Sequence, residues 1–332
     1  MIIDAYTHLF PEQYLKTISA MLDPGQMATW FRNTPLCNID ARLRTIEAIP
    51  EYKQVIANSM PPIEALGTPA DTPELARLSN DGLAQYCADY PDHFAAFVAS
   101  LPMNNVDAAV AEIDRAINTL GARGVQIFSN VNGIPLDDPQ FLPVFERMAE
   151  HDLPIWLHPV RSGEFADYRT ETLSKFAGFF TFGWPYETSI AMTHLIFSGL
   201  FDRFPGIKII AHHLGAMVPA FEGRIGVGFD DFTRYTSDGE LKAALERLAY
   251  HPADYYRMFY ADTATFGSAA GTRMGVAYFG ADRCVFASDA PFGRPGGIAT
   301  AVDTIEIVQS LGLNAGELDG ILYGTVSRLL RL

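Results

Sequence analysis

The sequence has no apolar run long enough to span a bilayer. Its first residues, MIIDAYTHLFP, lack both the basic region and the apolar stretch of a signal peptide. It holds only three cysteines (Cys37, Cys87 and Cys284), which are widely spaced and form no CxxC pair. Such a set argues against a disulfide framework and against a thiolate metal site. These absences predict a cytoplasmic protein in a reducing compartment.

Basic residues are scarce, with 24 Lys and Arg against 39 Asp and Glu and a net charge of −15. This charge would repel phosphate backbones and anionic lipid, so we expect neither nucleic acid nor a membrane as a partner. An anionic small molecule stays possible, because a local pair of arginines can outweigh the overall charge. Hydrophobic residues make up 48% of the 332 residues, which is ample for one large domain over residues 1–332.

Eight short apolar runs predict buried parallel strands, which are hydrophobic along their whole length. They are Ile2–Tyr6, Tyr52–Asn58, Phe94–Ser100, Gly124–Ser129, Pro154–His158, Ile207–His213, Met258–Asp262 and Cys284–Asp289. Stretches with helical periodicity separate most of them. This alternation predicts an α/β fold, a (β/α)₈ TIM barrel. An open doubly wound sheet is disfavoured, because no glycine-rich phosphate turn follows the first strand.

Two segments exceed what a plain barrel needs. Residues 10–45, which include Trp30, Phe31 and Cys37, are expected to form a small inserted cap over the barrel mouth. Residues 160–185 carry a run of aromatic residues and are expected to form a long loop on the same face. Both segments are too aromatic for disorder.

Polar residues close several predicted strands, and barrel active sites are built at strand carboxyl ends. These residues are Tyr6 and His8 on the first strand, His158 on the fifth, His213 on the sixth, Asp262 on the seventh and Asp289 on the eighth. Imidazole and carboxylate ligands suit one divalent metal, Zn²⁺ or alternatively Mn²⁺. We therefore expect His8, His158 and Asp289 to hold a metal.

Each of these residues also has a structural interpretation. A single strand-end histidine is more often structural than a ligand. Here three of the eight histidines fall at strand ends, which favours a site. Asp262 could equally accept loop backbone N–H groups. His212 precedes His213, and because strand side chains alternate, we expect only one of the two to face the axis.

Longer motifs carry a resemblance that runs almost end to end. They are the opening IIDAYTHLFP, ARLRTIE at 41–47, GVQIFSNVNGIPLDDPQF at 124–141, LPIWLHP at 153–159, ETSIAMTHLIFSGLFDRFPGIKIIAHHLG at 187–215 and RCVFASDAPFG at 283–293. In this order and spacing the chain resembles the amidohydrolase-related decarboxylases, the family of aminocarboxymuconate-semialdehyde and γ-resorcylate decarboxylases. That family fold is a (β/α)₈ barrel with a small inserted cap.

The resemblance implies roles for individual residues. His158 and Asp289 match metal ligands, and His213 matches the catalytic histidine. Arg42 matches an arginine that binds a substrate carboxylate, as suits the bidentate fork of a guanidinium. Arg224 matches an arginine that reaches the neighbouring subunit's site, which implies a homodimer or higher oligomer.

One position departs from the family pattern. The first strand usually ends in His-x-His, whereas this chain has Tyr6-Thr7-His8. Tyr6 either binds the metal as a phenolate, which the metal's charge would favour, or only lines the pocket. Both alternatives are open from the sequence.

The implied function is metal-dependent, non-oxidative decarboxylation of an aromatic or unsaturated carboxylic acid. Asp289 would protonate carbon, His213 would activate a metal-bound water or polarise the substrate, and Phe292 would stack on a planar ring. A metal-dependent hydrolase (a lactonase, for example) or a hydratase on the same barrel is the enzymatic alternative. A non-catalytic ligand-binding barrel is the other, motivated by the missing first histidine.

Overall fold

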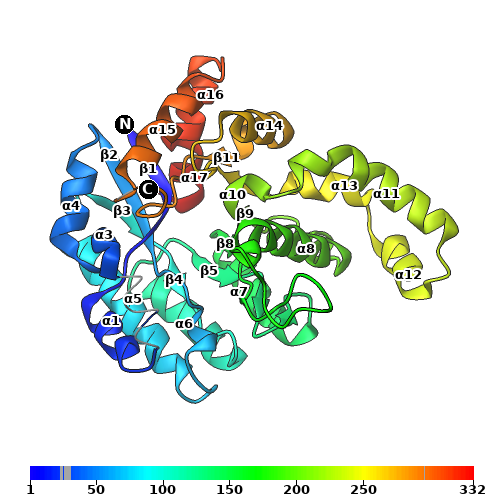
Figure 1. Cartoon of the computed structure of the whole chain (residues 1–332), viewed down its shortest axis with the longest axis horizontal. Coiled ribbons are helices and arrows are strands. Elements are labelled where there is room, and N and C mark those ends of the chain that lie inside the picture. The colour runs from blue at the N-terminus through cyan, green and yellow to red at the C-terminus, as the bar shows by residue number, and fades with distance from the viewer. Residues whose placement is uncertain (23–24, 26–30, 295) are drawn as a thin grey trace.

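The structure is a computed structural model that describes residues 1–22, 25, 31–294 and 296–332 (Figure 1). Trp30, expected in the cap, lies outside the described residues. No helix within the described ranges is both long enough and apolar enough to cross a membrane.

All eight predicted strands are present. They are β1 (Ile2–His8), β2 (Tyr52–Ala57), β3 (Phe94–Phe97) continued by β4 (Ala99–Ser100), β5 (Val125–Phe128), β8 (Ile155–His158), β9 (Ile209–Ala211), β10 (Tyr260–Asp262) and β11 (Cys284–Val285). They pair in chain order, β1-β2-β3 and β4-β5-β8-β9-β10-β11, and every pair is parallel. Ala5 N donates to Phe286 O at 2.8 Å, which joins the first strand to the chain after the last. The predicted (β/α)₈ barrel is confirmed.

The sixth and eighth strands are shorter than predicted. His213 and Asp289, expected as their last residues, have φ values of 55° and 62°. A residue in this left-handed region turns the chain, so the strands end before it. A small antiparallel pair, β6 (Asn130–Val131) with β7 (Ile134–Pro135), was not predicted.

Helices follow or separate the strands along the chain, and most of them pack around the barrel. They are α1 (Glu12–Ser19), α3 (Thr34–Cys37), α4 (Ile39–Glu47), α5 (Thr72–Asp89), α6 (Val106–Asn118), α7 (Leu142–His151), α8 (Trp184–Phe197), α9 (Leu200–Arg203), α10 (His212–Gly215), α11 (Glu222–Tyr235), α12 (Gly239–Arg247), α13 (Pro252–Tyr255), α14 (Ala269–Phe279), α15 (Ile298–Gln309), α16 (Ala315–Asp319) and α17 (Thr325–Leu330). Figure 1 shows α11 and α12 projecting away from the barrel body.

The core has two layers, and strand alternation assigns residues to them. In β8, Ile155 and Leu157 pack outward in the large cluster beneath the helices, whereas Trp156 packs inside the barrel. His158 follows Trp156 by two residues and therefore shares its inward face. This alternation aims the strand-end side chains at the barrel mouth.

The described part of the predicted cap lies against this mouth. Phe10, Tyr14 and Leu36 form a buried cluster, and Phe292 packs on it. Asn33 Nδ2 donates to Pro291 O at 3.0 Å, so the segment contacts the loop that follows Asp289.

Candidate metal centre and active site

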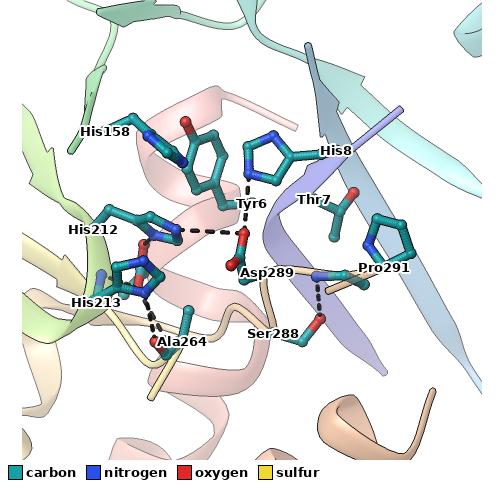
Figure 2. A network of polar contacts seen from close by, with 12 residues as sticks. Tyr6, Thr7, His8, His158, His212, His213, Ala264, Ser288, Asp289 and Pro291 are labelled. Atoms are coloured by element: carbon teal, nitrogen blue, oxygen red, sulfur yellow. Dashed lines mark hydrogen bonds and ion pairs between the residues drawn. The ribbon is translucent and has the colours of Figure 1, made fainter. Parts of the chain in front are cut away.

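Four histidines and one aspartate converge at the carboxyl ends of the strands (Figure 2). Potential ligand atoms of His8, His158 and His212 all lie within 4.8 Å of one another. So do those of a second, overlapping group, which consists of His212, His213 and Asp289. Of the predicted ligands, His8 lies beside both others: it is grouped with His158, and its Nε2 lies 3.0 Å from Asp289 Oδ1. His212, which was not predicted, belongs to both groups.

Each imidazole is oriented by a hydrogen bond from its Nδ1. His8 donates to Asn58 O (2.9 Å), His158 to Pro159 O (2.7 Å), His213 to Ala264 O (2.8 Å) and His212 to the Asp262 carboxylate (2.5 Å). These oxygens can only accept, so each Nδ1 carries the proton. Every neutral ring then has its lone pair on Nε2, as a metal-binding histidine requires.

The free ends of these side chains fit a cation. His8 Nε2 and His212 Nε2 lie 3.0 Å and 3.5 Å from Asp289 Oδ1. All three atoms are buried and make no well-formed hydrogen bond with the described residues. Two lone pairs and a carboxylate oxygen at such distances repel unless positive charge lies among them. Nitrogen and oxygen donors of this kind suit Zn²⁺ or Mn²⁺.

The pKa values show the same demand for positive charge. Burial alone would lower the pKa of His212, but Asp262 and Asp289 raise it to about 9. Burial would raise the pKa of Asp289, but His212 and His8 hold it well below its usual range. Burial and the neighbouring His212 lower the pKa of His158 far below its usual value, so that ring is a neutral donor.

The structure corrects the expectation that only one of the two adjacent histidines faces the axis. His212 is fully buried in the cluster, and its ring centroid lies 5.1 Å from that of His158. The alternation rule fails because β9 ends at Ala211 and His213 adopts a left-handed conformation, which places both imidazoles on one side. The sequence signal was present as two adjacent histidines directly after a strand.

His213 lies beside this group, and its imidazole is neutral. Burial and the neighbouring His212 lower its pKa to about 4. Its backbone N donates to Asp262 Oδ1 at 3.0 Å. Asp262 therefore accepts hydrogen bonds from both histidines. It has both of the roles considered for it, because it binds a backbone N–H group and also orients an imidazole of the site.

Tyr6 is buried at the centre of the same cluster. Its hydroxyl donates to Gln126 Oε1, and its ring centroid lies 4.7 Å from that of His212. Burial and the charges of Asp289 and Asp262 raise the pKa of Tyr6 well above its usual value. A hydroxyl that is already hydrogen-bonded to Gln126 favours the pocket-lining alternative over the phenolate ligand.

Hydrogen bonds from the first strand fix the backbone on either side of Asp289. Asp4 accepts hydrogen bonds from the hydroxyl of Ser288 and, at 3.0 Å, from its backbone N. His8 N donates to Ala290 O at 2.7 Å. These bonds fix the residues on either side of Asp289, whose left-handed backbone is unfavourable for a side chain other than glycine.

The two predicted arginines lie in different environments. Arg42 is fully buried, and its Nη2 donates to Ala290 O at 3.3 Å, beside Asp289. Its Nε and Nη1 make no hydrogen bond with the described residues. Arg224 is exposed on the projecting α11 and lines a groove of about 1000 Å³ between α8 and α11.

Aromatic side chains border the cluster on two sides. Phe292 has its ring centroid 5.7 Å from that of His8, and Trp184 has its centroid 5.8 Å from that of His158. Other aromatic residues of the 160–185 loop point into solvent instead of covering the site. Phe176 is 99% exposed and Tyr168 72% exposed.

The other four histidines lie in loops or helices, where a structural role is expected, and they take no part in the site. They form the surface pairs His93–Glu47, His151–Asp114, His194–Asp137 and His251–Asp230.

Comparison with known proteins identifies the family. The amidohydrolase family model matches residues 3–332, so the chain belongs to this family. It is 31% identical to a γ-resorcylate decarboxylase of Rhizobium sp. (strain MTP-10005), over 82% of this chain and 83% of that protein. It is also 31% identical to the 2-amino-3-carboxymuconate-6-semialdehyde decarboxylase of Dictyostelium discoideum, over 68% of this chain but only 58% of that protein.

A solved structure shows the same architecture. The dihydroxybenzoic acid decarboxylase of Polaromonas sp. JS666, with bound manganese and the inhibitor 2-nitroresorcinol, superposes with a TM-score of 0.82 at 25% identity. The match covers 100% of this chain and 97% of that one. The chain is accordingly a metal-dependent decarboxylase, a carboxy-lyase, of the amidohydrolase superfamily.

Proposed function

We propose that the protein removes CO₂ from a hydroxylated aromatic carboxylic acid, and that His8, His158, His212 and Asp289 hold its metal. The observation that carries this proposal is the close approach of His8, His158 and His212, whose possible ligand atoms lie within 4.8 Å of one another, together with Asp289 Oδ1, which lies 3.0 Å and 3.5 Å from Nε2 of His8 and His212. When bound there, a divalent metal supplies Lewis acidity that offsets the negative charge developing on the substrate.

Proton transfer is the step that the chain itself must perform. Asp289 is ionised at rest, because His212 and His8 hold its pKa below the usual range. We propose that Asp289 takes the proton of the substrate's hydroxyl and delivers it to the ring carbon that bears the carboxylate. The bond to the carboxylate then breaks, CO₂ leaves, and the bonding pair restores the aromatic ring.

His213 and Arg42 would orient the substrate. The neutral His213 ring has its proton on Nδ1, so its Nε2 can accept a hydrogen bond from a substrate hydroxyl. The unpartnered Nε and Nη1 of Arg42 are suited to a carboxylate, the partner that a guanidinium recognises best. Phe292 and Trp184 would exclude water and pack on the ring.

The metal and the assembly complete the proposal. Zinc is the sequence-based expectation with manganese as its alternative, and the manganese in the Polaromonas enzyme favours the alternative. We propose a cytoplasmic homodimer in which Arg224 of each subunit contributes to its partner's carboxylate site. The exposed position of Arg224 on α11 supports this assignment.

A substrate screen tests the reaction. The purified protein is supplied with Mn²⁺ or Zn²⁺ and incubated with benzoic, salicylic and muconate-type acids. Released CO₂ is detected, and the masses of the products are measured by mass spectrometry. We expect CO₂ release from a hydroxybenzoate. A product heavier by one water would instead establish the hydrolase or hydratase alternative.

A further inference from the structure

A pocket separate from the metal centre lies between helix α8 and the β6–β7 hairpin. Its volume is about 590 Å³, which is within the range of small-molecule sites. None of the proposed metal ligands lines it. Ser129 and Val160 line it and hydrogen-bond to each other, one and two residues after the strand ends at Phe128 and His158. The pocket is therefore a neighbour of the metal centre and not a part of it.

Apolar side chains form most of the walls of this pocket. They come from four different segments and are Pro62, Ala65, Pro135, Leu136, Val160, Phe165, Ile190 and Ala191. Helix α8 contributes Glu187, Ile190, Ala191 and His194, which follow one another at i, i+3, i+4 and i+7 and so share one face of the helix. Apolar walls with a few polar groups are typical of a site for a small organic molecule.

An ion pair in the lining offers a hydrogen-bond donor beside an acceptor. Arg161 Nη1 donates to Glu187 Oε1 at 2.8 Å, and the two side chains are only 22% and 19% exposed. Nε and Nη2 of Arg161 and Oε2 of Glu187 make no hydrogen bond with the described residues. The Arg161 guanidinium lies 5.3 Å from the centre of the Phe165 ring, so an aromatic wall adjoins the pair.

The charges around the pocket disfavour an anionic ligand. Glu164 and Glu187 line it, and Asp137 accepts a hydrogen bond from His194 Nδ1 at 2.9 Å. These three carboxylates outnumber the cationic groups, which are Arg161 and His194, whose pKa is raised by its hydrogen bond to Asp137. A carboxylate ligand would add a further negative charge, whereas a neutral ligand meets no such repulsion.

We propose that this pocket is a second binding site, distinct from the metal centre, for a small neutral phenol. A phenolic hydroxyl can donate to Glu187 and accept from Arg161 at the same time, while its ring packs against Phe165 and Ile190. A methyl ether has no proton to donate, and a benzoate brings a charge. The inference goes beyond the proposed function and does not depend on it. Where that function holds, loss of CO₂ turns a hydroxylated aromatic acid into a phenol, so the pocket would bind the product and reject the substrate.

Calorimetric titration with phenol tests this site. The titration is done with the metal-loaded enzyme and with the enzyme stripped by a chelator. One equivalent of phenol per chain should bind with the same affinity to both, because no metal ligand lines the pocket. Anisole and benzoate should bind to the stripped enzyme at least about tenfold more weakly than phenol does.

Two variants and a matched control place this binding in the pocket. Arg161→Leu should weaken phenol binding by about tenfold or more, because the donor to the hydroxyl is lost. Ala65→Trp should block the pocket from an exposed position, without a change in the core. Arg257→Leu is the control and should leave phenol affinity unchanged. Arg257 also pairs with a glutamate, Glu222, and lies over an aromatic ring, that of Tyr278, but it does not line the pocket.

The possible results separate this proposal from the proposed function. Phenol that binds only when metal is present, or not at all, would overturn the site, as would binding that is unchanged in both Arg161→Leu and Ala65→Trp. Benzoate that binds the stripped enzyme as tightly as phenol would overturn the neutral ligand class. Each of these results leaves CO₂ release from a hydroxybenzoate, and with it the proposed function, standing.

Discussion

At the scale of single residues, the two adjacent histidines have different hydrogen-bond partners. His212 has Asp262 on its Nδ1 and directs its Nε2 at Asp289, whereas His213 is held by a backbone carbonyl. A carboxylate behind an imidazole makes it a better metal ligand. This asymmetry supports the proposal that His212 binds the metal and His213 contacts the substrate.

The matched pair His212→Ala and His213→Asn separates these roles. His212→Ala should lose about 10–100-fold in metal affinity or more, since a ligand is removed. His213→Asn should bind metal normally while losing most of its turnover, by about 10²–10⁴-fold. Metal titration followed by CO₂ release measures both, and loss of metal from His213→Asn alone would reverse the assignment.

Glu64 makes a prediction about stability and pH. Burial raises its pKa from 4.5 to about 8, so the folded chain keeps a proton that the unfolded chain releases. Stability therefore falls as pH rises from about 4.5 towards 8, by an amount on the order of 5 kcal/mol at the upper end. Glu64→Gln cannot titrate, so the melting temperature of the variant minus that of the wild type should increase steadily between pH 5 and pH 8. A difference that stays constant with pH would contradict the buried, protonated carboxyl.

At the scale of elements, the first strand positions the chain that follows the last strand. Asp4 on β1 accepts hydrogen bonds from Ser288, which follows β11, and His8 N donates to Ala290 O. These two contacts clamp the chain on either side of Asp289, whose backbone is left-handed. The strand that supplies His8 thus also positions the carboxylate that lies 3.0 Å from it.

Ser288→Ala tests this clamp. Loss of the hydroxyl bond to buried Asp4 should cost about 1–3 kcal/mol of stability and also weaken metal binding, because Asp289 is less firmly held. The control is Ser129→Ala after β5, where the hydroxyl bonds Val160 and does not touch Asp289. A calorimetric metal titration should show weaker binding in Ser288→Ala only. Equal metal affinity in Ser288→Ala and Ser129→Ala would show that Ser288 does not position Asp289.

The same elements show how far the sequence determines the site. Buried strands were recognisable from continuous apolar runs, and their ends placed His8, His158 and Asp289 correctly at the mouth. His212 was missed because strand alternation was extended past Ala211, into a turn that only the three-dimensional structure shows.

At the scale of the whole molecule, the projecting α11–α12 arm exposes apolar side chains. Phe221, Val227 and Phe232 are at least 42% exposed, and the groove beside them is open. Monomeric soluble proteins rarely expose large contiguous apolar patches. The arm is therefore the surface through which we expect two subunits to associate, with Arg224 in the first turn of α11.

Arg224→Ala should raise KM for the acid by about tenfold or more while kcat and melting temperature change little, because a charged hydrogen bond to the substrate is lost. Arg234→Ala, an exposed arginine farther along the same helix, is the control and should leave KM unchanged. Kinetics of both variants are compared with the mass in solution from light scattering. A monomer with normal turnover would exclude the shared site.

The central claim is that the His8, His158, His212 and Asp289 cluster holds the metal on which decarboxylation depends. The most direct measurement is CO₂ release from a hydroxybenzoate by protein stripped with a chelator and then titrated with Mn²⁺ or Zn²⁺. The account predicts negligible release from the stripped protein and recovery that saturates at one metal per chain. Full activity without metal, or saturation unaffected by His158→Ala, would contradict it.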